Sequence, residues 1–135
     1  MKRSMLMSAC LLSCGAALAD NLQGVDRLLC ATGEIVLCVE GDECYAVLAA
    51  DIGVPDFVIV DLEAKTLSTT EASQQNRMTP IANISRSEGR IFLQGIERGR
   101  AFSFLIDEVT GRVTVAVSRD GATVSVFGAC TTARH

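Results

Sequence analysis

Residues 101–118, Ala-Phe-Ser-Phe-Leu-Ile-Asp-Glu-Val-Thr-Gly-Arg-Val-Thr-Val-Ala-Val-Ser, decide the fold class. Two runs in this stretch alternate with a period of two, and a polar segment containing Gly111 separates them. One face of the two runs carries Phe102, Phe104, Ile106, Val113, Val115 and Val117. Side chains of a strand point alternately to its two faces, so this pattern is typical of half-buried strands in an antiparallel sheet. The stretch therefore predicts a β-hairpin with one face in a core.

The same pattern recurs along the chain, between turn signals at short intervals. Strands are predicted at 57–62, 66–70, 80–86, 90–96, 101–106, 112–118 and 123–130. One or two more are expected around 28–39 and 44–48, for a total of eight or nine, while 71–77 reads as a loop or single turn. Consecutive hairpins close into a barrel or fold over as a sandwich. We favour an all-β fold, a small antiparallel up-and-down barrel or strongly curved meander of about 8 strands, because closure removes exposed edges.

Residues 1–19 have the three regions of a secretory signal peptide. Lys2 and Arg3 give a positive start, Met5 to Leu12 is apolar, and Ala-Leu-Ala at 17–19 is a cleavage site before Asp20. A transmembrane anchor needs about 20 apolar residues, more than this run offers. The sequence therefore predicts an exported protein, periplasmic or secreted, with one all-β domain at 20–135 and no membrane span.

Lipid attachment at Cys14 is the alternative interpretation of the N-terminal region. Residues 11–15, Leu-Leu-Ser-Cys-Gly, loosely match the bacterial lipoprotein pattern, in which the cysteine becomes the new N-terminus. The apolar run before Cys14 is short for that pattern. We therefore favour cleavage by signal peptidase before Asp20.

Four cysteines remain after the signal peptide: Cys30, Cys38, Cys44 and Cys130. An even number in an exported chain predicts two disulfides, for which three pairings exist. We favour Cys38 with Cys44, because the polar loop between them is centred on Gly41. Cys30 then pairs with Cys130, which ties the first strand to the last and would hold the seam of a barrel. A zinc site is disfavoured because no C-x2-C pair is present.

The charge of the chain disfavours nucleic acid and anionic lipid as partners. The full chain has a net charge of −4, and loss of Lys2 and Arg3 leaves −6. Residues 20–63 hold ten acidic residues and only Arg27 as a base, whereas residues 64–135 hold nine bases, eight of them arginine. Either these halves pack together within one domain, or the second half presents an arginine-rich face to an acidic partner.

The sequence contains no recognisable catalytic arrangement. His135 is the only histidine and ends the chain, so the Ser-His and Cys-His nucleophile systems are excluded. With one tyrosine, Tyr45, and no tryptophan, the aromatic platforms of carbohydrate sites are also scarce. The acidic loop of Glu40, Asp42 and Glu43 lacks the spacing of a calcium loop and is predicted to be a solvated turn. We expect no enzyme activity, no cofactor and no metal.

Arg98 and Arg100 are the candidate binding residues. They flank Gly99 in a predicted tight turn and would present two guanidinium groups at one mouth of a barrel. The competing interpretation is an ordinary solvated turn. An anionic ligand would make these two residues the first to test.

Several segments resemble a family of small exported proteobacterial proteins of unknown function. They are Met-Thr-Pro-Ile at 78–81, Leu-Gln-Gly-Ile-Glu-Arg-Gly-Arg-Ala at 93–101, residues 106–112, and Phe-Gly-Ala-Cys-Thr at 127–131. The likeness covers nearly all of the chain after residue 19, with its four cysteines. It implies a periplasmic setting and no particular activity, substrate or site.

Two classes of function follow from these expectations. The first is a periplasmic binding or inhibitory module whose loops or interior take a small molecule or an envelope protein. The second is a structural or accessory envelope protein that acts through its surface. An open interior would favour the first, and a filled barrel with an evenly polar surface the second.

Overall fold

The structure is a computed structural model that describes residues 21–133. The predicted signal peptide, Cys14 and His135 lie outside these residues, and the statements about them stay predictions. No helix within 21–133 is long and apolar enough to cross a membrane.

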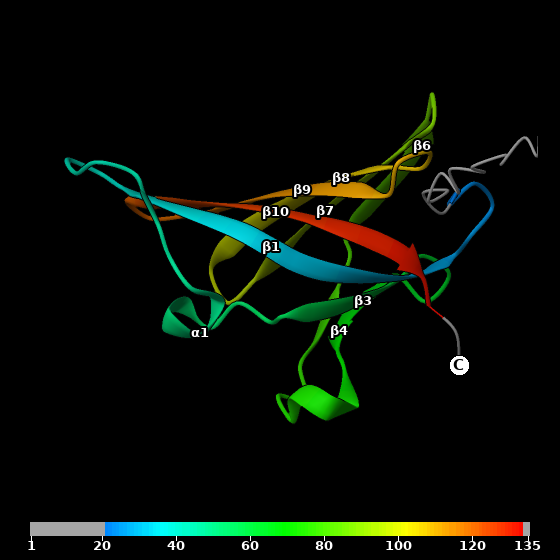
Figure 1. Ribbon diagram of the computed structural model, residues 1–135, viewed down its shortest axis with the longest axis horizontal. Coiled ribbons are helices and arrows are strands. Elements are labelled where there is room, and N and C mark those ends of the chain that lie inside the picture. The colour runs from blue at the N-terminus through cyan, green and yellow to red at the C-terminus, as the bar shows by residue number, and fades with distance from the viewer. Residues whose placement is uncertain (1–20, 134–135) are drawn as a thin grey trace, which may run out of the picture.

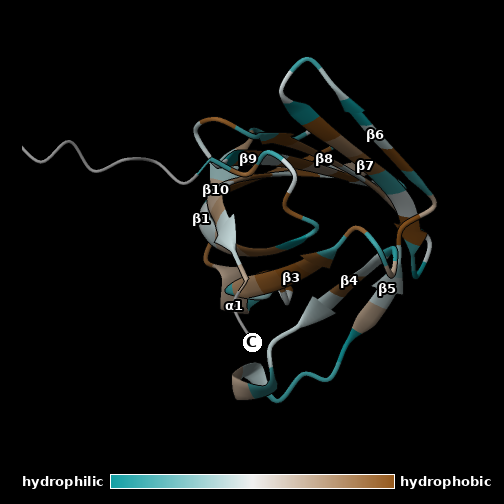
Figure 2. Ribbon diagram, turned by 90° about the vertical axis from the view of Figure 1, so that its right-hand side faces the viewer, coloured by the Kyte–Doolittle hydropathy of each residue, from teal (hydrophilic) through white to brown (hydrophobic). Residues whose placement is uncertain are grey.

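A single antiparallel sheet curls into a half-barrel (Figures 1 and 2). Its strands are β1 (Arg27–Val39), β2 (Tyr45–Ala46), β3 (Phe57–Asp61), β4 (Thr66–Thr69), β5 (Met78–Pro80), β6 (Asn83–Ser87), β7 (Arg90–Glu97), β8 (Arg100–Asp107), β9 (Arg112–Arg119) and β10 (Ala122–Thr132). Two short helices, α1 (Ala49–Ile52) and the 3-10 helix η1 (Glu71–Ser73), lie in the connections. The predicted all-β class and strongly curved sheet are confirmed.

The first and last strands lie in the middle of the sheet. The strand order is β5-β4-β3-β1-β10-β9-β8-β7-β6, and β2 pairs with β1 beside this path. In Figure 2 the strands β6 to β9 form the upper arm of the curve and β3 to β5 the lower arm, joined through β1 and β10. The free edges of the sheet are therefore β5 and β6, which follow each other in the chain.

The predicted strand at 80–86 is wrong, because the chain changes edges there. The Ile81 amide donates to the Lys65 carbonyl at 2.8 Å, and the next amide, of Ala82, donates to the Gln94 carbonyl at 2.9 Å. These acceptors lie on opposite arms of the sheet, and Pro80 has no amide hydrogen to continue the ladder. One predicted strand becomes β5 and β6, which raises the number of strands to ten.

Two disulfides join the same cysteine pairs that the sequence predicted. Cys30 and Cys130 face each other in the register of β1 and β10, with their sulfurs 2.02 Å apart. Cys38 and Cys44 close the loop between β1 and β2, at 2.06 Å. They indicate a non-reducing compartment. The expectation that the long-range bridge holds the seam is wrong, since β1 and β10 are already hydrogen-bonded neighbours and the edges lie elsewhere.

The inward face of the curve carries the core. The predicted inward positions Phe102, Ile106, Val113 and Val115 are buried, and their alternation with exposed residues is confirmed. The most deeply buried side chains gather toward one end of the half-barrel, where β1 begins and β10 ends; they are Leu22, Leu28, Val60, Ile91, Leu93 and Ile106. This end of the half-barrel is filled.

The segment before β1 closes the filled end. Leu22 is fully buried, and its amide donates to the carbonyl of Glu108 at 2.7 Å. Arg86 fastens the segment from β6 by donating to the carbonyl of Val25 at 2.8 Å and to the carboxylate of Asp26 at 3.1 Å. The segment before β1 therefore caps this end of the half-barrel.

We expect the two disulfides to contribute unequally to stability. Replacing Cys30 and Cys130 by serine should lower the free energy of unfolding by about 4–5 kcal/mol, against about 2 kcal/mol for Cys38 and Cys44, because the loops closed differ so much in length. Denaturant titration of the two double variants measures the difference. Peptide mapping of unreduced protein checks the pairing, and a fragment linking Cys30 to Cys38 would contradict it.

Leu22→Ala should destabilise the protein by roughly 2–5 kcal/mol, because it removes a fully buried side chain from a filled end. Gln23→Ala, in the same segment but exposed, is the matched control. Chemical denaturation gives both values. If Leu22→Ala lowers the free energy of unfolding by less than about 1 kcal/mol, an effect typical of surface substitutions, the segment does not cap the core.

Candidate functional site

The end of the half-barrel opposite Leu22 is not filled. It contains a cavity of about 410 Å³. Part of its apolar lining comes from α1 and the loop that follows, through Ile52, Val54 and Pro55. The rest comes from inward positions of β1, β3, β4, β8, β9 and β10, which include Leu37, Val58, Leu67, Phe102, Phe104, Val113, Val115, Val117, Val124 and Val126. Valine is too short to reach across the curve, so the inward face of β9 leaves space where the larger residues of the other end do not.

Phenylalanines of β8 form one wall of the cavity. The rings of Phe102 and Phe104 meet edge to face, with their centroids 5.9 Å apart. The Phe102 ring lies over Gly95 on the neighbouring strand, where a Cβ atom would collide with it. Gly95 thus gives this ring its place in the wall.

An ion pair at the mouth of the cavity connects the two arms of the sheet. Arg77, next to β5, places Nη2 2.8 Å from Oε1 of Glu97 at the end of β7. Its Nη1 donates to the carbonyl of Gly53, after α1, at 3.1 Å. One guanidinium group therefore links three segments across the gap between the arms.

Glu97 is held in its ionised form. Burial by itself would raise the pKa of its carboxyl group. The hydrogen bond and charge of Arg77, a hydrogen bond with Thr79 and the charge of Arg100 outweigh that effect and bring the pKa below its ordinary value of 4.5. The charges of Glu97 and Arg77 therefore already neutralise each other.

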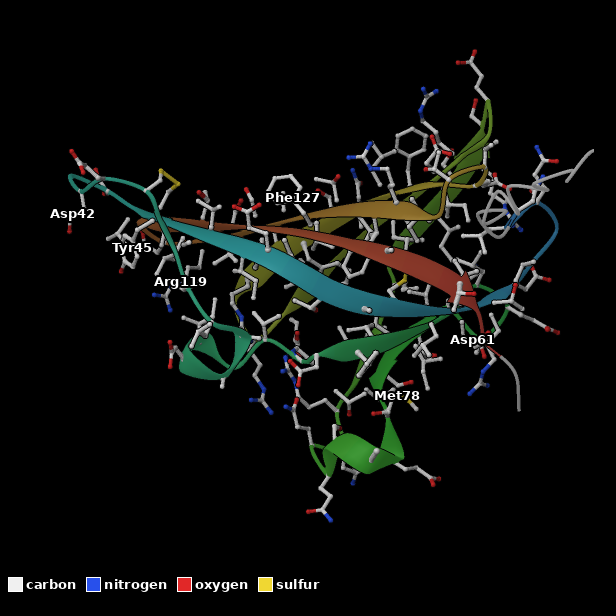
Figure 3. The ribbon with its side chains drawn as sticks, viewed as in Figure 1. Asp42, Tyr45, Asp61, Met78, Arg119 and Phe127 are labelled. Atoms are coloured by element: carbon white, nitrogen blue, oxygen red, sulfur yellow. A yellow bond between two sulfur atoms is a disulfide. The ribbon has the colours of Figure 1, made fainter. Side chains whose placement is uncertain are left out.

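Arg100 and Arg119 stand next to each other at the same mouth. The register of β8 with β9 runs to Ala101 opposite Ser118, so the next pair of positions is Arg100 and Arg119. Both line the cavity, since they share the inward parity of Phe102 and Val117. Figure 3 shows Arg119 and Asp61 at opposite ends of the sheet. Arg119 lies at the end where β1 finishes, and Asp61 at the end where β1 begins. Among residues 21–133, no carboxylate lies within 4.0 Å of either guanidinium group.

The two candidate binding residues of the sequence analysis separate. Arg100 lines the cavity, whereas Arg98 sits in the turn with a φ of 48° and lines a second, more open hollow beside Met78 and Ile96. Sequence reasoning missed Arg77, Glu97 and Arg119. Arg119 had a signal, because it continues the period-two series of Val113 to Val117 on the inward face.

The site offers apolar contact, guanidinium donors and the carboxylates of Asp51 and Glu97. Within 21–133, no group of three or more His, Cys, Asp or Glu side chains is placed to hold a metal ion. The acidic loop of Glu40, Asp42 and Glu43 is exposed at the tip between the bridged cysteines, and Figure 3 shows Asp42 at that tip. The arrangement suits non-covalent binding of an organic molecule.

Comparisons with models of protein families, with curated proteins and with solved structures found no match to this chain.

Glu97→Gln should reduce the acid sensitivity of the fold. Since folding lowers the pKa of Glu97, its stabilising contribution is full above about pH 4.5 and is lost as the pH falls through the folded-state value. The variant should lose about 1 kcal/mol near neutral pH, and its unfolding free energy should approach that of the unmodified protein as the pH falls below the folded-state pKa. Urea titrations across this pH range test this, with the exposed Glu71→Gln as control. A constant difference at every pH would contradict it.

Proposed function

We propose that the protein is an exported, non-enzymatic binding module, periplasmic or secreted, which takes a small, mainly apolar molecule into its half-barrel. The observation that carries this proposal is the cavity of about 410 Å³ at the open end. Its size lies within the range of about 300–1,000 Å³ for small-molecule pockets. Its lining is apolar, with a few polar groups at the mouth, as such pockets require.

Burial of apolar surface favours binding of a ligand in the cavity. Each Å² of apolar surface that leaves water on binding contributes about 25 cal/mol, so a ligand that covers the valine and phenylalanine walls gains affinity from both partners. The walls are held in place before binding, since β1 and β10 are hydrogen-bonded along their length and joined by a disulfide. Little ordering would then oppose binding.

An accessory envelope protein that acts through its surface is the second candidate. Phe92 and Leu105 face each other on the outer side of β7 and β8, and Phe127 is exposed on β10, on the side facing away from β3 and β4 (Figure 3). These side chains are 38–45% exposed. Scattered apolar residues are common on protein surfaces, whereas an open cavity lined mainly by apolar side chains is typical of a small-molecule site, so the binding module is the stronger proposal.

Val117→Phe should abolish binding of a neutral apolar fluorophore such as N-phenyl-1-naphthylamine. The added ring would occupy the cavity near its mouth, because Val117 lines it between Phe102 and Val124. Fluorescence titration measures the affinity. Ala116→Phe, one residue away on the outer face, adds bulk without entering the cavity and should bind like the unmodified protein.

The proposal fails if the unmodified protein does not enhance the fluorescence of the probe. It also fails if Val117→Phe and Ala116→Phe reduce binding equally, because the probe would then bind outside the cavity. Thermal melting of both variants shows that they remain folded.

A further inference from the structure

We propose that the occupant of the cavity is a free single-chain amphiphile with a carboxylate head, such as a medium-chain alkanoate. Arg100 and Arg119 would bind the head, and the tail would lie along the valines of β9. This inference rests on the proposed function and names the class of ligand. Three observations carry it: the charge of the mouth, the free donors there, and the apolar depth behind them.

Two like charges stand next to each other on neighbouring strands. Extending the register of β8 and β9 by one position places Arg100 opposite Arg119, and like charges in such positions destabilise a sheet. The chain as a whole is acidic, with a net charge of −4, yet within 21–133 no carboxylate oxygen lies within 4.0 Å of either guanidinium group. Glu97, which faces Arg100 in the register of β7 and β8, is the nearest acidic residue in that pairing. An anionic ligand would supply the missing countercharge.

Glu97 does not play that role. Its carboxylate is engaged by Arg77 at 2.8 Å and by Thr79. Among residues 21–133, Arg100 donates from Nε alone, in a long hydrogen bond of 3.5 Å to the carbonyl of Glu97. Its outer nitrogens are therefore available, and a guanidinium group binds a carboxylate through two parallel hydrogen bonds.

The lining changes from charged to apolar one step below the arginines. Phe102 and Val117 face each other at the next inward positions, about 7 Å further along their strands. From Arg119 to Val113 the inward face of β9 extends about 20 Å, all of it valine after the first residue. A head bound at the mouth therefore places its tail in apolar surroundings.

The test compares three probes in competition with N-phenyl-1-naphthylamine. Decanoate has head and tail, decanol has the tail alone, and butanoate has the head with a short tail. We expect decanoate to bind about tenfold or more tightly than decanol, because charge-assisted hydrogen bonds form only with the carboxylate. Butanoate should compete weakly.

The variants Arg100→Gln and Arg119→Gln should each weaken decanoate binding about tenfold and leave decanol binding unchanged. Arg112→Gln is the matched control, since Arg112 lies at the opposite end of the same strand and does not line the cavity. Arg119→Lys, which keeps the charge, should retain part of the preference. Melting temperatures confirm that each variant is folded.

Equal affinity for decanoate and decanol, or variants that weaken both alike, would overturn this inference and leave the proposed function standing. Failure of decanol, decanoate and the neutral fluorophore to bind would overturn both. Binding to vesicles of anionic phospholipid in preference to free decanoate would show that the arginines serve a membrane surface, and would also overturn the inference.

Discussion

The pairing of β1 with β10 is the contact on which the other parts of the structure depend. These strands are the first and last long strands of the chain, and ten pairs of residues join them, with a shift of register between Thr32 and Ile35. Each then carries one arm of the sheet, β3 to β5 on β1 and β6 to β9 on β10. The disulfide between Cys30 and Cys130 lies within this pairing and limits how far the strands can separate in the unfolded chain.

The curvature that follows from this arrangement creates an interior with two different ends. At the end where β1 begins, Leu22 and the leucines and isoleucines of β1, β7 and β8 fill the space. At the other end, the inward positions of β9 and β10 are valines, and the space between the arms stays open. The sheet curves in the same way at both ends, so the cavity results from the smaller side chains at one of them.

The mouth of the cavity divides its charges unequally. Arg77 and Glu97 neutralise each other and tie the arms together, which gives them a structural role. Arg100 and Arg119 share the same mouth, and among the described residues no carboxylate oxygen lies within 4.0 Å of either guanidinium group. Arg77 and Glu97 therefore hold the fold. Arg100 and Arg119, above the apolar interior, are available for a ligand.

The sequence by itself determined the features that depend on local order along the chain. Period two in 101–118 predicted half-buried strands, and the loop around Gly41 predicted the Cys38–Cys44 bridge, because both depend on residues close together in the chain. Even Arg100 could be named as a candidate binding residue from its place beside a turn. The break of 80–86 into two strands could not be predicted, because it depends on hydrogen bonds from Ile81 and Ala82 to residues on opposite arms.

Only the tertiary structure decided which charged residues share the mouth. Arg77, Glu97 and Arg119 come from three different parts of the chain, and the curvature of the sheet brings the arms that carry them to one mouth. Arg98 and Arg100 separate for a local reason, because Arg98 lies in the turn with a φ of 48° whereas Arg100 begins β8 and lines the cavity. Turns and alternation encode the register of the consecutive hairpins, but the pairing of β1 with β10 and with β3 joins residues far apart in the chain, so local patterns do not predict it or the curve that follows from it.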